Sequence, residues 1–134
     1  MWRRFFKDGL ATMFERVKSR GKLVALHSCG NISELLPDLI DIGLDIYQTV
    51  QPEIYDLPAL KSEFGERLTF WGGLSTQRDL PFDPPDVLKR KIEETTAVMG
   101  ASGGYIAGPT HRLPPDVPFE NIRTLIETLR IDEG

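Results

Sequence analysis

The sequence predicts an α/β fold in which four parallel strands alternate with helices, half the number of units in an eight-unit TIM barrel. Three observations support this prediction. Short apolar runs bounded by glycine suit buried parallel strands. Segments with apolar residues at helical spacing lie between these runs. The connecting loops are short and no linker divides the chain, so residues 1–134 are expected to form a single partial domain. An open doubly wound sheet remains an alternative, because periodicity alone does not exclude it.

The first half of the chain supplies two predicted strands. Residues 2–20 have an apolar stripe at helical spacing and end before a glycine, which predicts a helix packed against the core. Residues 23–26 are apolar on both parities, as expected of a buried parallel strand. Helical spacing returns over residues 31–43, where Pro37 predicts a broken or restarted helix. The second strand is expected over residues 44–50.

The same alternation continues in the second half. A capping residue followed by an early proline predicts a short helix over residues 56–65. The third strand, residues 68–71, runs into two glycines. Two prolines and an aspartate open a longer helix over residues 84–100, and residues 105–107 form the fourth strand. An amphipathic helix is expected after the proline start signal at residues 116–118.

The size of the chain implies a structure that needs a partner. A complete barrel of this kind takes about 250 residues, whereas this chain has 134. A half barrel has two unpaired strand edges and an uncovered inner face, and unpaired edges favour pairing with another chain. We therefore expect the missing half of the barrel, or another chain, to complete the fold.

Composition excludes several classes of function. Twenty acidic residues against sixteen basic ones give a net charge of -4, which argues against a nucleic-acid surface. No apolar run is long enough for a membrane span, and the N-terminus lacks a signal-peptide core, so a cytoplasmic protein with no membrane partner is expected. Because Cys29 is the single cysteine, the fold must depend on packing and not on disulfides.

Three nitrogen and sulfur side chains are expected at one rim of the sheet. His27 and Cys29 follow the first strand and project to the same side, because residues i and i+2 of a strand share a face. His111 follows the fourth strand, whose end lies at the same rim. Imidazole and thiolate are zinc ligands, so these residues are candidate metal ligands. The alternative is a buried, inert cysteine beside two hydrogen-bonded histidines.

Other polar or flexible residues follow the second and third strands. Glu53 is a further candidate metal ligand, and Gln51 is a candidate substrate-binding residue on the same loop. Gly72, Gly73 and Ser75 follow the third strand and are candidate substrate-binding residues, with tight turn chemistry as the alternative role of the glycines. The strand aromatic residues are expected in the core, and these are Tyr47, Trp71 and Tyr105.

Several motifs together resemble the uroporphyrinogen decarboxylase superfamily. The motifs are HSCGN at 27–31, LPDLI at 36–40, GLD at 43–45, VQPE at 50–53, FWGG at 70–73 and DVPFENI at 116–122. The resemblance covers essentially the whole chain and matches the C-terminal part of the family. It implies the C-terminal half of a TIM barrel, with the N-terminal half missing. The His-x-Cys pair is similar to the branch of zinc-dependent, corrinoid-dependent methyltransferases that pass a methyl group to a thiol.

The ligand set that the resemblance implies for this chain differs from that of the methyltransferase branch in one residue. In that branch the zinc ligands are the histidine and cysteine of the motif and a later cysteine, whereas His111 occupies the later position here. Exchanging a thiolate for a neutral imidazole makes the site one charge more positive. A histidine at this position also resembles the true decarboxylases, so tetrapyrrole decarboxylation in porphyrin biosynthesis, a lyase reaction, is the alternative. A noncatalytic remnant or a barrel-completing subunit is the third possibility. The isolated chain is expected to be inactive.

Overall fold

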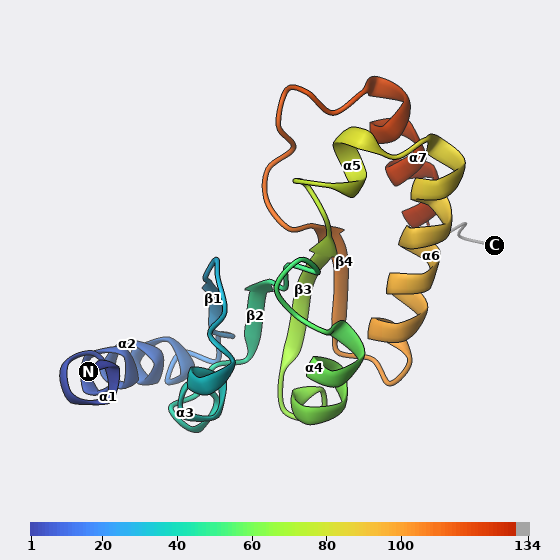
Figure 1. Ribbon diagram of the computed structural model, residues 1–134. Coiled ribbons are helices and arrows are strands. Elements are labelled where there is room, and N and C mark those ends of the chain that lie inside the picture. The colour runs from blue at the N-terminus through green and yellow to red at the C-terminus, as the bar shows by residue number, and fades with distance from the viewer. Residues whose placement is uncertain (131–134) are drawn as a thin grey trace.

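A computed structural model describes residues 1–130 of the chain (Figure 1). Helices and strands alternate along most of its length. In chain order the elements are α1 (Trp2–Phe5), α2 (Lys7–Lys18), β1 (Ala25–His27), the 3₁₀ helix η1 (Ser33–Leu35), α3 (Leu36–Asp41), β2 (Ile46–Thr49), α4 (Leu57–Phe64), β3 (Thr69–Leu74), α5 (Asp79–Phe82), α6 (Pro85–Gly100), β4 (Tyr105–Pro109) and α7 (Phe119–Leu129).

The strands form one parallel sheet in the order β1-β2-β3-β4, so each strand pairs with the next strand along the chain. In a doubly wound sheet the strand order reverses at a switch point. The uninterrupted order therefore selects the barrel-type winding over the open alternative. Four parallel strands alternating with helices confirm the predicted fold class.

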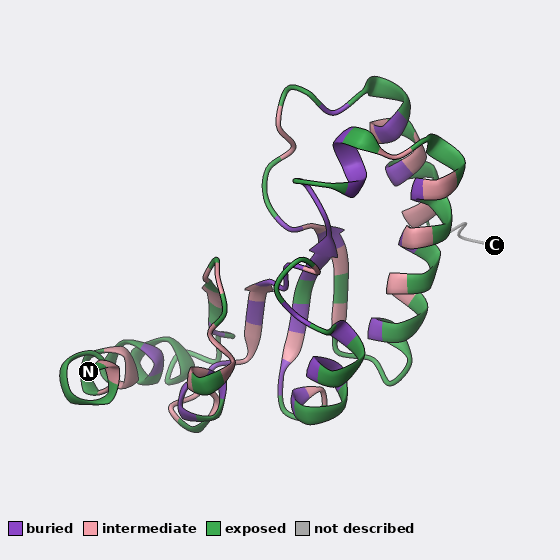
Figure 2. Ribbon diagram, in the orientation of Figure 1, coloured by how far each residue is buried: buried purple, intermediate pink, exposed green. Residues whose placement is uncertain are grey.

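Packing between the sheet and the helices forms the core. Tyr47 of β2 and Phe70 of β3 are fully buried against apolar residues of α3 and α4. A second cluster joins the end of β3 to α5, α6 and α7, with Leu80, Leu88 and Ile92 at most 1% exposed. Figure 2 shows the buried residues gathered on the strands and on the helices beside them. One face of the sheet is thus covered.

The other face of the sheet is open. The register aligns His27 of β1, Gln48 of β2, Trp71 of β3 and Ile106 of β4 in one row across the four strands. Trp71 is 41% exposed and Ile106 is 44% exposed. The prediction that Trp71 lies in the core is wrong, because its parity turns it to the face that carries no helices. In a closed barrel such rows form the packed interior.

The N-terminal helix differs most from its prediction. It is divided at Phe6 into α1 and α2, which lie beyond β1 at one side of the sheet (Figure 1). Phe14 is buried, but Phe5, Phe6 and Met13 are each more than half exposed. Only part of the predicted apolar stripe therefore contacts the core, and the rest faces outward beside an unpaired strand edge.

Several local predictions are confirmed by the elements observed. The helix predicted to break at Pro37 does so: η1 ends at Leu35 and α3 restarts with the proline in its first turn. Asp56 caps α4 by accepting a hydrogen bond from the Ala59 N–H at 3.0 Å. The predicted loop glycines Gly72 and Gly73 instead belong to β3. The short helix α5 was not predicted.

A buried carboxylate fastens the N-terminal helices to α3. Arg3 donates from Nε to Asp38 Oδ2 at 2.5 Å, and Lys7 donates from Nζ to Oδ1 at 2.6 Å. These hydrogen bonds from Lys7 and Arg3 hold the pKa of Asp38 below its ordinary value. A depressed folded-state pKa adds stability above the unfolded-state value, near 3.8, and that stability is lost as the pH falls further.

We therefore expect acid to release α1 and α2 from α3 at a pH below about 4. Emission from Trp2, which packs against the core, reports this release in a Trp71→Phe background. Asp38→Asn is the control, since it removes the titrating group, and its emission is expected to lack the transition. An identical acid transition in both proteins would contradict this assignment.

Candidate metal and substrate site

The carboxyl end of β1 brings an imidazole and a thiol together. His27 is the last residue of β1, and Cys29 lies two residues further along. The His27 Nε2 and Cys29 Sγ atoms are 3.7 Å apart, and both side chains are exposed at the rim. The sequence prediction that these two residues face the same side is therefore consistent with their positions.

Gln48 orients the His27 ring. Its side chain lies beside His27 on β2, where the two residues are register partners. Gln48 Oε1 accepts a hydrogen bond from His27 Nδ1. Because an amide oxygen only accepts, Nδ1 donates in this contact, and the other ring nitrogen, Nε2, faces Cys29. Sequence reasoning missed Gln48, because the strand register that pairs it with His27 is known only from the folded sheet.

His111 reaches the same rim from the opposite edge of the sheet. It follows β4, two strands away from the pair formed by β1 and β2. Its ring centroid is 5.6 Å from that of His27, and the two ring planes make an angle of 76°. His27, Cys29 and His111 therefore lie at one rim of the sheet, at the ends of its two outer strands.

The donor set suits zinc. Tetrahedral zinc with bonds of about 2.0 Å to nitrogen and 2.3 Å to sulfur sets these two atoms about 3.5 Å apart. The observed separation of His27 Nε2 and Cys29 Sγ is 3.7 Å. Across residues 1–130, no three His, Cys, Asp or Glu side chains already converge as a metal-binding group. Binding by all three candidates thus requires an adjustment of His111.

A braced loop supports Cys29. Tyr47 donates to the Ser28 carbonyl at 3.1 Å, and Tyr55 donates to the Gly30 carbonyl at 2.9 Å. Burial raises the pKa of Tyr47 well above its ordinary value, so its hydroxyl stays protonated and able to donate. The two carbonyls on either side of Cys29 are therefore held in place by buried phenols.

Gln51 braces the same loop from the turn after β2. Its Oε1 accepts a hydrogen bond from the Gly30 N–H at 3.3 Å, and the residue is 8% exposed. The preceding residue, Val50, has a φ of 58°, the left-handed region that β-branched residues rarely adopt. This turn directs Gln51 toward the Cys29 loop. Its contact with substrate stays a prediction.

Glu53 contacts Ser75 and not the pair formed by His27 and Cys29. Its Oε1 accepts a hydrogen bond from Ser75 Oγ. Ser75 is 1% exposed, and its Oγ also accepts from the Arg78 N–H at 2.9 Å, just before α5. These contacts give Ser75 and Glu53 an internal role in holding two loops together. Their roles as substrate-binding residue and metal ligand stay predictions.

The two glycines of β3 lie where a side chain would contact the neighbouring strands too closely. A Cβ atom on Gly72, whose φ is 122°, would lie 2.0 Å from the Thr49 carbonyl oxygen. One on Gly73, whose φ is 83°, would lie 2.9 Å from the Tyr105 hydroxyl. Packing against the neighbouring strands thus explains both glycines. Their contact with substrate is not required to account for them and stays a prediction.

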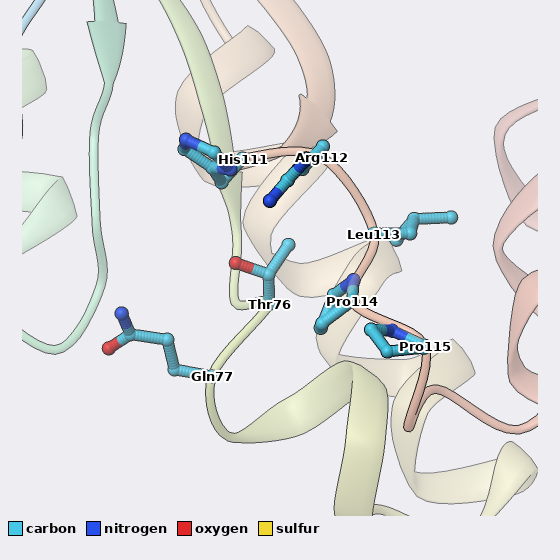
Figure 3. Close-up of a pocket in the computed structure, with 7 residues that line it drawn as sticks. All are labelled: Thr76, Gln77, His111, Arg112, Leu113, Pro114 and Pro115. Atoms are coloured by element: carbon cyan, nitrogen blue, oxygen red, sulfur yellow. The ribbon is translucent and has the colours of Figure 1, made fainter.

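A pocket of about 530 Å³ opens beside His111 (Figure 3). Residues 76–77, after β3, and residues 111–115, after β4, line it. Sequence reasoning placed His111 at this rim but did not identify the pocket, because its walls come from two loops that lie far apart in the sequence.

Comparison with known proteins places the chain in a family. The sequence profile of the uroporphyrinogen decarboxylase (URO-D) family matches residues 1–131. The chain belongs to the URO-D family. This confirms the resemblance drawn from the motifs around His27 and Cys29.

Methyltransferases are among the relatives of this URO-D chain. A methylcobamide:CoM methyltransferase, MtaA, from Methanosarcina barkeri is 30% identical over 125 residues, which cover 93% of this chain and 34% of that protein. MtaA from strain Fusaro of that species is 27% identical and covers 90% of this chain and 34% of its own length. A solved methyltransferase from Methanosarcina mazei superposes with a TM-score of 0.73 at 26% identity, covering 95% of this chain and 35% of that one.

This URO-D chain therefore spans about a third of the length of the relatives it matches. Similarity to methyltransferases matches the branch suggested by the His-x-Cys pair.

Among the helices within residues 1–130, none has the length and apolar character needed to cross a membrane.

Proposed function

We propose that this chain forms the metal-binding part of a URO-D-family barrel that transfers a methyl group from a methyl-corrinoid to a small thiol. Zinc would be held by His27, Cys29 and His111. The observation that supports this most directly is the separation of 3.7 Å between His27 Nε2 and Cys29 Sγ. The relatives that are methyltransferases support the same reaction class. The composition predicts that the reaction takes place in the cytoplasm.

Each of the three residues has a defined task in this proposal. His27 donates a hydrogen bond from Nδ1 to Gln48 Oε1, and its other ring nitrogen, Nε2, faces Cys29 and would bind the metal. Cys29 supplies a thiolate from a loop whose flanking carbonyls are fixed. His111 adds a neutral donor from the far side of the rim. A zinc ion bound by these groups supplies Lewis acidity, which lowers the pKa of a substrate thiol.

The rest of the site positions the acceptor thiol. In the transfer, the acceptor thiol would release its proton to solvent, and its sulfur would then take the methyl group from the methyl-corrinoid substrate, which would keep the electron pair of the broken bond. The exposed rim beside His27 and His111 leaves the sulfur accessible to the methyl donor. The main contribution of rigidly held side chains to methyl transfer is to orient the thiol sulfur and the methyl group for reaction.

Completion of the barrel belongs to the same proposal. The row that contains Trp71 and Ile106 leaves an apolar inner face open, and β1 and β4 have unpaired edges. The relatives are about three times as long as this chain. We infer that strand and helix units equivalent to the remainder of the relatives, on the same or another polypeptide, close the barrel over this face.

Metal titration tests the proposal. Dialysed protein is expected to retain about one zinc per chain, measured by inductively coupled plasma analysis. Gln48→Leu is expected to weaken zinc affinity by about 10- to 100-fold, because partners that orient a ligating histidine have effects of this size. Gln48→Glu keeps an oxygen that can accept from His27 Nδ1, so it is the control and is expected to retain zinc affinity. Absence of zinc in the wild-type protein and in its complex with the rest of the barrel would refute the proposal.

Decarboxylation of a tetrapyrrole is the alternative that the family as a whole suggests. In that case Cys29 is inert and His111 donates a hydrogen bond to the substrate. Tetrapyrrole binding that is insensitive to chelators and to Cys29→Ser would favour this alternative. The close approach of Cys29 to an oriented His27 favours methyl transfer.

A further inference from the structure

The two outer strands of the sheet each have one free edge. Within residues 1–130, β1 pairs only with β2, and β4 pairs only with β3 (Figure 1). All four strands are parallel and follow chain order, so the free edge of β4 can pair in parallel with the free edge of another β1. Eight parallel strands close a barrel, and two copies of this sheet supply eight. A two-fold axis along the barrel makes the two new strand pairs identical.

Exposed apolar side chains lie where a second copy would cover them. Trp71 and Ile106, on the open face of the sheet, are 41% and 44% exposed. Leu23, just before β1, is 69% exposed, and Met13 on α2 is 62% exposed. Burial of such side chains is the main favourable contribution to the association of protein chains.

The strand register predicts which residues meet at the junction of the two copies. An eight-stranded barrel of this type has a shear of about eight residues, so each of two identical halves contributes a shift of about four. The row across the sheet starts at His27, the last residue of β1, and ends at Ile106, near the start of β4. Continued into the partner, the row moves from the position of His27 to that of Leu23. Ile106 therefore meets the partner's Leu23, and both are exposed apolar residues.

The helices leave room for this junction. Asn121 donates to two carbonyls at the ends of α5, each at 2.9 Å, and so holds α7 against α5. Tyr105 and Ala107 of β4, which alternate with the open-face residues, are only partly buried. In a dimer the partner's α2 would lie against them. That contact would also cover Met13 and Val17, which are exposed one helical turn apart on α2.

We propose that two copies of this chain close one eight-stranded barrel, with β4 of each copy paired to β1 of its partner. The same register sets Thr110, the residue before His111, beside the partner's His27. Each His111 would then lie next to the partner's His27 and Cys29 pair, so the second copy contributes to the candidate metal site. This inference rests on the barrel closure in the proposed function and makes the closing polypeptide a second copy.

Sedimentation of the metal-free 134-residue chain tests the inference. The main species is expected to have about twice the chain mass of 15.1 kDa. Ile106→Asp is expected to weaken self-association by at least about 100-fold, because each junction would bury a carboxylate without a partner. Phe82→Asp is the matched control, since it adds the same charge at a side chain that is 73% exposed on α5, away from the junction. A monomeric wild-type chain, or equal effects of the two variants, would overturn the inference.

A disulfide tests the register of the junction without a charged substitution. In a Cys29→Ser background, Leu23→Cys combined with Ile106→Cys is expected to give disulfide-linked dimers on mild oxidation. Directly opposed residues on neighbouring strands have Cα atoms about 5 Å apart, which is within disulfide range. Leu23→Cys combined with Phe82→Cys is the control and is expected to cross-link at least about 10-fold less. Equal cross-linking of the two pairs would overturn the inference.

Zinc content measured on the wild-type samples separates this inference from the proposed function. A monomer that binds zinc overturns the second copy and leaves the proposed function with another polypeptide closing the barrel. A dimer that cross-links as described but holds no zinc supports the second copy and counts against the metal site.

Discussion

Replacing Gly72 with alanine is expected to destabilise the protein by at least about 3 kcal/mol, because the change imposes two penalties at once. The added Cβ would lie 2.0 Å from the Thr49 carbonyl oxygen, which is backbone and cannot rotate away. A φ of 122° is also unfavourable for any residue with a side chain. Urea denaturation followed by circular dichroism measures the loss. Where the variant does not fold, its soluble yield gives the same answer.

Two further variants keep this prediction testable. Gly9→Ala lies within α2, where no atom is within 4 Å of the new Cβ, and it is expected to stabilise the protein by up to about 1 kcal/mol. Gly73→Ala meets the Tyr105 hydroxyl at 2.9 Å, so adding Tyr105→Phe is expected to restore part of its loss. Equal stability of the Gly72 and Gly9 variants would show that β2 and β3 do not approach as closely as described.

Replacing Cys29 with alanine is expected to reduce zinc affinity by more than about 100-fold, beyond the upper range for partners that only orient a ligand. The change removes the single thiolate and leaves two neutral imidazoles, so the site loses both a ligand and a negative charge. Cobalt titration gives a direct readout. The thiolate-to-metal charge-transfer band is expected in the wild-type protein and absent from the variant.

Ser28→Ala is the matched control for the cysteine. Ser28 lies between the two candidate ligands, and its Oγ contacts only the adjacent Cys29 carbonyl, at 3.3 Å, among the hydrogen bonds of the described chain. Its substitution is expected to leave both the band and the affinity intact. Cobalt binding with a charge-transfer band that survives loss of Cys29 would show that the sulfur is not a ligand.

The strands and most helices were predictable because their determinants are local. Short apolar runs fix the four strands, and the cap at Asp56 and the proline at position 37 act within one helical turn. The outer helices were predicted less well. Apolar residues at helical spacing indicate which side chains can be buried. Whether Phe5 and Met13 are buried depends on what packs beyond β1, and the spacing of residues does not indicate that.

Strand order also predicted which residues share the rim, since His27 ends β1 and Cys29 and His111 follow the ends of β1 and β4. The partners that give each side chain its orientation could not be predicted in the same way. Gln48 reaches His27 through register, and Ser75 reaches Glu53 between two loops. Both contacts join residues about twenty positions apart in the sequence, so only the paired sheet brings them together.

The left-handed backbone at Val50 links the rim to the interior. A valine keeps that conformation only while the surrounding side chains enforce it, and Val50 is fully buried in the main cluster. Should that cluster loosen, the peptide would relax toward an extended shape and withdraw Gln51 from Gly30. The position of the Cys29 loop therefore depends on how tightly the cluster around Val50 is packed. On warming, we expect this loop to lose its fixed position before the strands separate.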